Sequence, residues 1–218
     1  MKRYLLFLAA VVILFGCKSA NKSQKGAAIG AAGGAVIGGL VAKNSVVGAL
    51  LGAAIGGTAG YFIGKSMDKQ AQELKQAVPN AEVNRVGEGI NMTFNSGLLF
   101  KINSAELSDS AKKDIANVCQ VLKKYDDTKI LLEGHTDDTG AEAFNMDLSK
   151  KRAEAVGSYM EANGVPRTRI TEKWYGEEQP KFPNDSEANR EKNRRVEIGI
   201  TADENMKAEA QKGEIKDK

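Results

Sequence analysis

Hydrophobic and polar positions divide the chain into five stretches of different pattern. Residues 4–15 form a nearly unbroken apolar run, and residues 26–64 combine apolar residues with regularly spaced glycine. Residues 65–78 are amphipathic, residues 81–201 mix helical and strand periodicities, and residues 202–218 are rich in Lys and Glu with few bulky apolar side chains. Because periodicity reports secondary structure, each stretch predicts a different kind of segment.

Residues 1–16 have the layout of a bacterial export signal. Lys2 and Arg3 form a charged start, and the apolar run of residues 4–15 follows. This run is shorter than a membrane-spanning helix requires. It therefore predicts a cleaved signal, with a plain hydrophobic anchor as the alternative.

The signal ends in a cysteine motif. The sequence Leu14-Phe15-Gly16-Cys17 resembles the lipobox of bacterial lipoproteins, which implies cleavage before Cys17 and acylation of its thiol and amine. Several acyl chains give stable attachment, since each buried methylene contributes about 0.8 kcal/mol. In Gram-negative lipoproteins an Asp after the cysteine favours the inner membrane, so Lys18 favours the outer membrane. Residues 17–25 are then the lipidated cysteine and a polar tether.

Residues 26–64 carry glycine at every fourth position, in two halves offset by 22 residues. The glycines are Gly26, Gly30, Gly34, Gly38, Gly48, Gly52, Gly56, Gly60 and Gly64. In a bilayer this spacing lets two helices approach closely. The stretch predicts a helical hairpin that turns at Lys43-Asn44-Ser45, and it resembles the glycine-zipper segments of envelope lipoproteins. Membrane insertion, self-association without insertion and a flexible linker all fit the pattern.

Residues 65–80 predict a connecting helix. Met67, Ala71, Leu74 and Val78 share one helical face, and the charged residues between them form a solvated face. The charged residues 202–218 predict a disordered tail.

Residues 81–201 predict one globular domain of α+β class. We expect a hairpin over residues 82–94, helices at 109–125 and 145–163, and strands at 129–134 and 169–174. A short helical turn and a last strand, over residues 194–200, should follow, and we expect that strand to add to the edge of the sheet. The prediction is a two-layer sandwich, with a mixed sheet and helices on one face.

The composition excludes several classes of function. The net charge is +3 without a concentrated basic stripe, which argues against nucleic-acid binding. One His and two Cys are too few for a His/Cys metal site, and nothing indicates a cofactor. Cys119 falls on the apolar face of its helix, so we expect a small core residue there. His135 has no nucleophile motif beside it, so we expect it to stiffen a loop rather than to catalyse.

The candidate binding residues follow the strand at 129–134. Asp137 comes just after the strand, and Asn145 and Arg152 share one face of the next helix. A carboxylate and a guanidinium that converge in this way can hold a zwitterion, with Asp137 on its ammonium and Arg152 on its carboxylate. The alternative is a structural ion pair, with Asn145 acting only as a helix cap.

A resemblance favours the ligand interpretation. The segments 132–137, 145–153, 175–184 and 193–198 resemble, in order and spacing, the OmpA C-terminal-like (OmpA/MotB/Pal) family of peptidoglycan-binding domains. The match covers roughly residues 85–201. It implies non-covalent binding of the diaminopimelate in the peptide stem of peptidoglycan, gripped by Asp137 and Arg152.

The resemblance also implies neighbouring contacts from Thr136, Asn145, Asn103 and Arg194, and it leaves Arg195 as a surface charge. One residue departs from the family pattern. Many members have Asp directly after the Phe of the first cleft wall, and this chain has Lys101 after Phe100, which makes the rim more positive.

The sequence therefore predicts a non-catalytic lipoprotein of the outer membrane that ties this membrane to the wall. Its expected partners are peptidoglycan, membrane lipid through Cys17 and the hairpin, and further copies of itself. Two alternatives remain: a wall hydrolase that uses the same cleft, and an assembly factor that acts through the glycine zipper.

Overall fold

The computed structural model describes residues 55–101 and 103–215. The predicted export signal, Cys17 and its tether lie outside the described residues, as does the glycine-rich stretch up to residue 54. Within the described part of the chain, no helix is long and apolar enough to cross a membrane.

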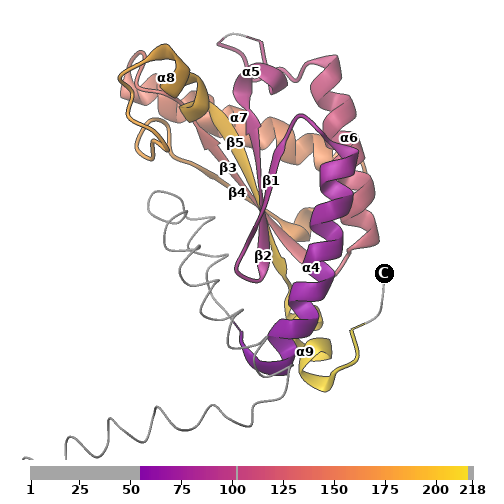
Figure 1. Cartoon of the computed structure of the whole chain (residues 1–218). Coiled ribbons are helices and arrows are strands. Elements are labelled where there is room, and N and C mark those ends of the chain that lie inside the picture. Colours follow the sequence, from indigo (N-terminus) through magenta and orange to yellow (C-terminus); the bar gives the residue numbers. More distant parts are fainter. Residues whose placement is uncertain (1–54, 102, 216–218) are drawn as a thin grey trace, which may run out of the picture.

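The described elements follow one another from helix α4 to helix α9 (Figure 1). They are α4 (Gly57–Ala77), β1 (Glu82–Val86), β2 (Gly89–Asn95), α5 (Ser96–Leu99), α6 (Asp109–Lys124), β3 (Thr128–His135), α7 (Glu142–Ala162), η3 (Arg167–Arg169), β4 (Ile170–Trp174), α8 (Glu187–Asn193), β5 (Arg195–Ala202) and α9 (Glu204–Lys212).

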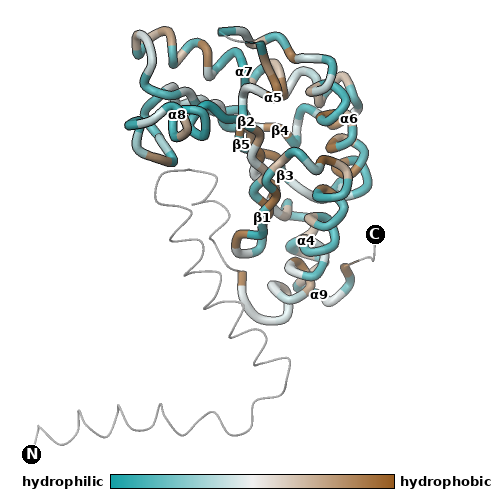
Figure 2. The backbone as a smooth tube through the Cα atoms, turned by 45° about the horizontal axis from the view of Figure 1, so that its top comes forward, coloured by the Kyte–Doolittle hydropathy of each residue, from teal (hydrophilic) through white to brown (hydrophobic). Residues whose placement is uncertain are grey.

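The strands form one mixed sheet in the order β1-β2-β5-β3-β4. Neighbouring strands are antiparallel except for β3 and β4, which are parallel. One hydrophobic core joins this sheet to helices α4, α6, α7 and α9. Figure 2 shows hydrophobic positions concentrated on the strands, and hydrophilic ones around α8. The predicted α+β sandwich is confirmed.

The last strand is central rather than at the edge. β5 lies between β2 and β3, and seven of its eight residues are buried. The expectation of an edge position is therefore wrong. Val196, Ile198 and Ile200 do face the apolar core, but the alternate residues Arg195 and Glu197 are buried as well. Alternation alone could not reveal that both faces of this strand are covered.

Helix α4 crosses the expected boundary between the glycine zipper and the connecting helix. It begins at Gly57, and its buried residues include Ala59 and Ile63 as well as Met67 and Leu74. The helix contacts α6, α9 and β1, so it belongs to the core. The domain start expected at residue 81 is therefore too late, because the apolar face of the connecting helix is the same face that packs on the domain.

The start of α4 fits closely against the β1–β2 turn. The carboxylate of Glu88 accepts hydrogen bonds from the backbone N–H groups of Ile55, at 3.0 Å to each oxygen, and Gly56, at 3.1 Å. A Cβ atom on Gly60 would overlap with Glu88 Oε1. Further along the helix, Arg85 Nε lies 2.7 Å from Asp68 Oδ1. The glycine spacing thus serves the attachment of α4 to the domain at this point.

The segment expected to be a disordered tail contains helix α9. Asp203 Oδ1 caps it by accepting a bond from Met206 N at 2.8 Å, and Gly213 ends it in the left-handed conformation. Met206 and Ala210, one turn apart, are fully buried against the core. The expectation is therefore wrong for residues 204–212. Burial of Met206 and Ala210, with a cap at each end, stabilises this short helix beside α4.

Candidate functional site

A cavity of about 820 Å³ opens where α5, α7 and α8 meet beyond the end of β3. It is lined by all six residues that the sequence marks as candidate ligand contacts: Asn103, Thr136, Asp137, Asn145, Arg152 and Arg194. These residues come from four separate segments of the chain. The fold thus brings the predicted set together in one place.

The end of β3 and the helix α7 approach each other closely at Gly134. A Cβ atom at this position would overlap with the backbone carbonyl oxygen of Ser149 in α7. Ser149 Oγ in turn accepts a hydrogen bond from Gly176 N at 3.0 Å, and Gly176 O accepts one from Thr136 N at 2.8 Å. This packing fixes the loop that carries Thr136 and Asp137 against the face of α7 that carries Arg152.

Asp137 is buried and bonded through both carboxylate oxygens. Its Oδ1 accepts a hydrogen bond from Thr139 N at 3.0 Å, and its Oδ2 lies 2.5 Å from Arg194 Nη1. Only 4% of Asp137 is exposed. A carboxylate has about four acceptor positions, so the two bonds leave room for a ligand donor.

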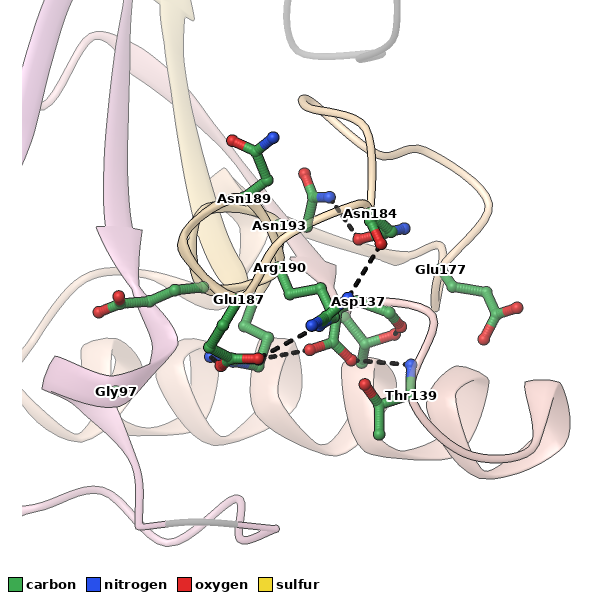
Figure 3. A network of polar contacts seen from close by, with 12 residues as sticks. Gly97, Asp137, Thr139, Glu177, Asn184, Glu187, Asn189, Arg190 and Asn193 are labelled. Carbon is green, nitrogen blue, oxygen red and sulfur yellow. Dashed lines mark hydrogen bonds and ion pairs between the residues drawn. The ribbon is translucent and has the colours of Figure 1, made fainter.

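Arg194 joins Asp137 to a carboxylate that the sequence prediction missed. Its Nη2 lies 2.6 Å from Glu187 Oε1 at the start of α8. Figure 3 shows Asp137 and Glu187 converging on this network beside Thr139. Burial lowers the pKa of Arg194, but its bonds to Glu187 and Asp137 outweigh burial and raise the pKa overall. The i, i+7 spacing of Glu187 and Arg194 is the one signal that could have indicated this pair.

Arg152 is the most deeply placed cation of the cavity. It is 5% exposed, its Nε donates to the carbonyl of Ser104 at 3.1 Å, and its guanidinium lies over the Phe100 ring, with 5.2 Å from Cζ to the centroid. Burial lowers the pKa of Arg152, and the charge of Arg194 lowers it further. No carboxylate of the described residues lies within ion-pair distance of it. The guanidinium remains charged at neutral pH, because its pKa starts far above 7.

Asn145 holds the loop rather than capping the helix with its oxygen. Its Nδ2 lies 3.3 Å from Asp137 O, 3.2 Å from Thr139 O and 2.6 Å from Glu177 Oε2. Helix α7 already begins at Glu142, so the simple cap alternative does not apply. Asn103 lines the opposite wall, where it adopts φ = 53° in the left-handed region.

A second group of charged residues is buried on β3 and β5 outside the cavity. Arg195, expected at the surface, is 1% exposed, and its Nε lies 2.6 Å from Glu197 Oε1. Burial raises the pKa of Glu197, but the charge and hydrogen bond of Arg195, together with the charges of His135 and Lys181, lower the pKa overall. His135 is fully buried, with its ring stacked on Tyr175 at 5.4 Å between centroids. The surface assignment of Arg195 is therefore wrong.

The chain matches two family models. The OmpA family model matches residues 99–194, and a YMGG-like Gly-zipper model matches residues 1–68. The chain is also 30% identical over 132 residues to the peptidoglycan-associated lipoprotein of Buchnera aphidicola, and the match covers 60% of this chain and 76% of that protein. The chain belongs to the OmpA family.

Other members of the OmpA family give similar matches. The chain is 34% identical over 116 residues to the outer-membrane lipoprotein YfiB of Pseudomonas aeruginosa, across 53% of this chain and 69% of YfiB. It is 33% identical over 141 residues to the lipoprotein YiaD of Escherichia coli, across 64% of each chain, so it spans less than two thirds of that relative.

Solved structures agree with the OmpA family fold. The periplasmic domain of Helicobacter pylori MotB superposes with a TM-score of 0.53 at 27% identity, and the match covers 61% of this chain and 88% of that domain. The prediction of an OmpA C-terminal-like domain with a glycine-zipper segment before it is thereby confirmed at the level of the family.

Proposed function

We propose that this chain is a peptidoglycan-binding lipoprotein that performs no reaction on the wall. The cavity grips the free amino-acid end of diaminopimelate, with Asp137 on its ammonium and Arg152 on its carboxylate. One observation carries the proposal: Arg152, buried and charged, has no carboxylate partner among the described residues and lines the same cavity as Asp137. A bidentate carboxylate from a ligand would compensate the cost of burying this guanidinium.

The relatives support the class of ligand and the location. One is named a peptidoglycan-associated lipoprotein, and another an outer-membrane lipoprotein. For this chain we propose acylation at Cys17, an outer-membrane anchor and a wall-binding domain in the periplasm. Thr136, Asn145, Asn103 and Arg194 complete the ligand contacts.

The test is co-sedimentation of the full chain, in detergent, with purified protein-free peptidoglycan sacculi. Asp137→Asn and Arg152→Gln should each lose retention, while thermal melts show that they remain folded. The matched controls are Asp138→Asn and Lys151→Gln, which change exposed neighbours of the same charge. If both site variants stay folded and sediment like the wild type, the assignment of the site is wrong.

The same samples separate a binder from a hydrolase. A binding protein leaves the muropeptide masses unchanged after prolonged incubation with sacculi. New muropeptide species that require the wild-type chain would refute the non-catalytic proposal.

The match of a Gly-zipper model to residues 1–68 favours a second candidate, an assembly factor that acts through the glycine-rich stretch. A deletion that tests it must stop before residue 55, because α4 belongs to the domain core and the residues just before it bind Glu88. If the protein is an assembly factor, removing residues 26–54 would abolish its assembly activity. Wall binding would be preserved under both candidate functions.

A further inference from the structure

The cavity contains more positive charge than the amino-acid end of one ligand requires. Three cations line it: Lys101, Arg152 and Arg194. The charge of Arg194 is already balanced, since Asp137 and Glu187 lie 2.5 Å and 2.6 Å from its two terminal nitrogens. Lys101 and Arg152 therefore remain to receive negative groups of a ligand.

Lys101 belongs to the same short segment that holds Arg152. Phe100, its neighbour, lies under the Arg152 guanidinium, and Ser104, three residues further on, accepts the bond from Arg152 Nε. Lys101 and Arg152 thus line the same cavity from one short segment and the helix face that it contacts. The only ion pair described for Lys101 is with Glu106, at 3.6 Å between Nζ and Oε2.

That ion pair leaves Lys101 available. The side chains of Lys101 and Glu106 are 71% and 69% exposed, and exposed pairs at this separation contribute little. The remaining carboxylates of the cavity lining are engaged elsewhere. Asp137 and Glu187 bind Arg194, and Glu191 accepts a bond from Asn95 Nδ2 at 3.3 Å. Glu106 is therefore the carboxylate that a ligand would have to displace from Lys101.

We propose that Lys101 binds a second, free carboxylate of the stem peptide, next to the diaminopimelate end that Arg152 and Asp137 hold. This inference rests on the proposed function and defines which stem peptides the site prefers. Two parts of a stem can supply the group: the α-carboxylate of the γ-linked glutamate, or the terminal carboxylate of a stem that ends at diaminopimelate. The first lies on the residue before diaminopimelate, and the second lies on the backbone of diaminopimelate itself.

The test is isothermal titration of the full chain in detergent with soluble muropeptides of defined structure. The tripeptide with free glutamate is compared with its isoglutamine form, in which the α-carboxylate is an amide. It is also compared with the tetrapeptide, in which the diaminopimelate backbone carboxylate is an amide and the free terminal carboxylate lies one residue further on, on alanine. The variants are Lys101→Gln and Lys101→Arg. Lys207→Gln is the control, because Lys207 also forms a surface ion pair but lies in α9, away from the cavity (Figure 1).

Lys101→Gln should weaken binding of the free-acid tripeptide by about two- to five-fold, the range of an exposed ion pair, and Lys101→Arg should retain it. The difference should disappear in high salt, which screens exposed charges. It should also disappear for whichever ligand lacks the carboxylate that Lys101 binds, and that ligand identifies the source.

The outcomes separate this inference from the proposed function. If Lys101→Gln and wild type bind all three muropeptides equally while Asp137→Asn binds none, Lys101 has no role and the proposed site stands. If the wild type binds none of them, the proposed function and this inference are both overturned.

Discussion

Arg152 lies over the ring of Phe100, with its Cζ 5.2 Å from the ring centroid, and Ser104 anchors its Nε. The flat guanidinium is therefore held in one orientation before any ligand arrives. Its two terminal nitrogens form no ion pair within the described part of the chain. The stacking gives Arg152 a role that depends on its shape as well as its charge.

Arg152→Lys should therefore weaken binding to sacculi by at least about ten-fold, although the charge is preserved. An ammonium cannot stack flat on Phe100, and it cannot bind a carboxylate bidentately. The measurement is a sedimentation isotherm beside Lys151→Arg, an exposed neighbouring change. Equal affinity of Arg152→Lys and wild type would show that only the charge matters.

The stability of the domain should fall as the pH falls through the range in which an unfolded histidine titrates. Burial is the main cause that lowers the pKa of His135, and the charge of Arg195 lowers it further, against the opposing effects of Glu133 and Glu197. Below about pH 6.5 the unfolded chain therefore takes up a proton that the folded chain does not. The free energy of unfolding should drop by up to about 1.4 kcal/mol per pH unit there.

Urea unfolding of the wild type and of His135→Gln at pH 7.5, 6.5 and 5.5 measures this effect. The variant should lose less stability than the wild type between the first and last pH. An identical loss in both would assign the pH dependence to other groups, such as Glu197.

Met206→Ala should destabilise the domain by about 2–5 kcal/mol, the usual cost of truncating a buried Met. The side chain is fully buried where α9 packs on α4. Lys207→Ala, at the next position, should change stability by less than about 0.5 kcal/mol. Chemical unfolding of the two variants gives the comparison, and equal effects would mean that α9 contributes no packing.

The thiol of Cys119 should not react in the native protein. Cys119 is fully buried, and burial raises its pKa to about 11, so the reactive thiolate is scarce at neutral pH. If Cys17 is acylated, protein isolated from membranes should show no reactive thiol when native and one per chain when denatured. Two thiols after denaturation would contradict acylation of Cys17.

Sequence reasoning located Asp137, Asn145 and Arg152 because the positions that carry them follow local rules. A strand that ends at a close-packed glycine and a helix with its polar residues on one face bring Asp137 and Arg152 together by geometry alone. The motifs of the family added Asn103 and Arg194, which belong to remote segments.

The parts that were missed depend on tertiary packing. Arg195 and Glu197 alternate with apolar residues as an exposed face would, and only the central position of β5 buries them. Met206 and Ala210 are too few to indicate a helix in a charged segment, and only the presence of α4 makes α9 stable. Glu187 and Arg194 stand at the two ends of α8, and this helix is too short for a hydrophobic periodicity to have indicated that they pair.

The fit between Gly60 and Glu88 has a mechanical consequence. Under the proposed function the chain is fixed to a membrane at one end and to the wall at the other, and tension between the two would enter the described domain at the first turn of α4. The bonds from Ile55 and Gly56 to the Glu88 carboxylate lie at that entry point. Because α4 packs on the core along its length, a pull that acts along the helix axis would load many contacts at once rather than one after another.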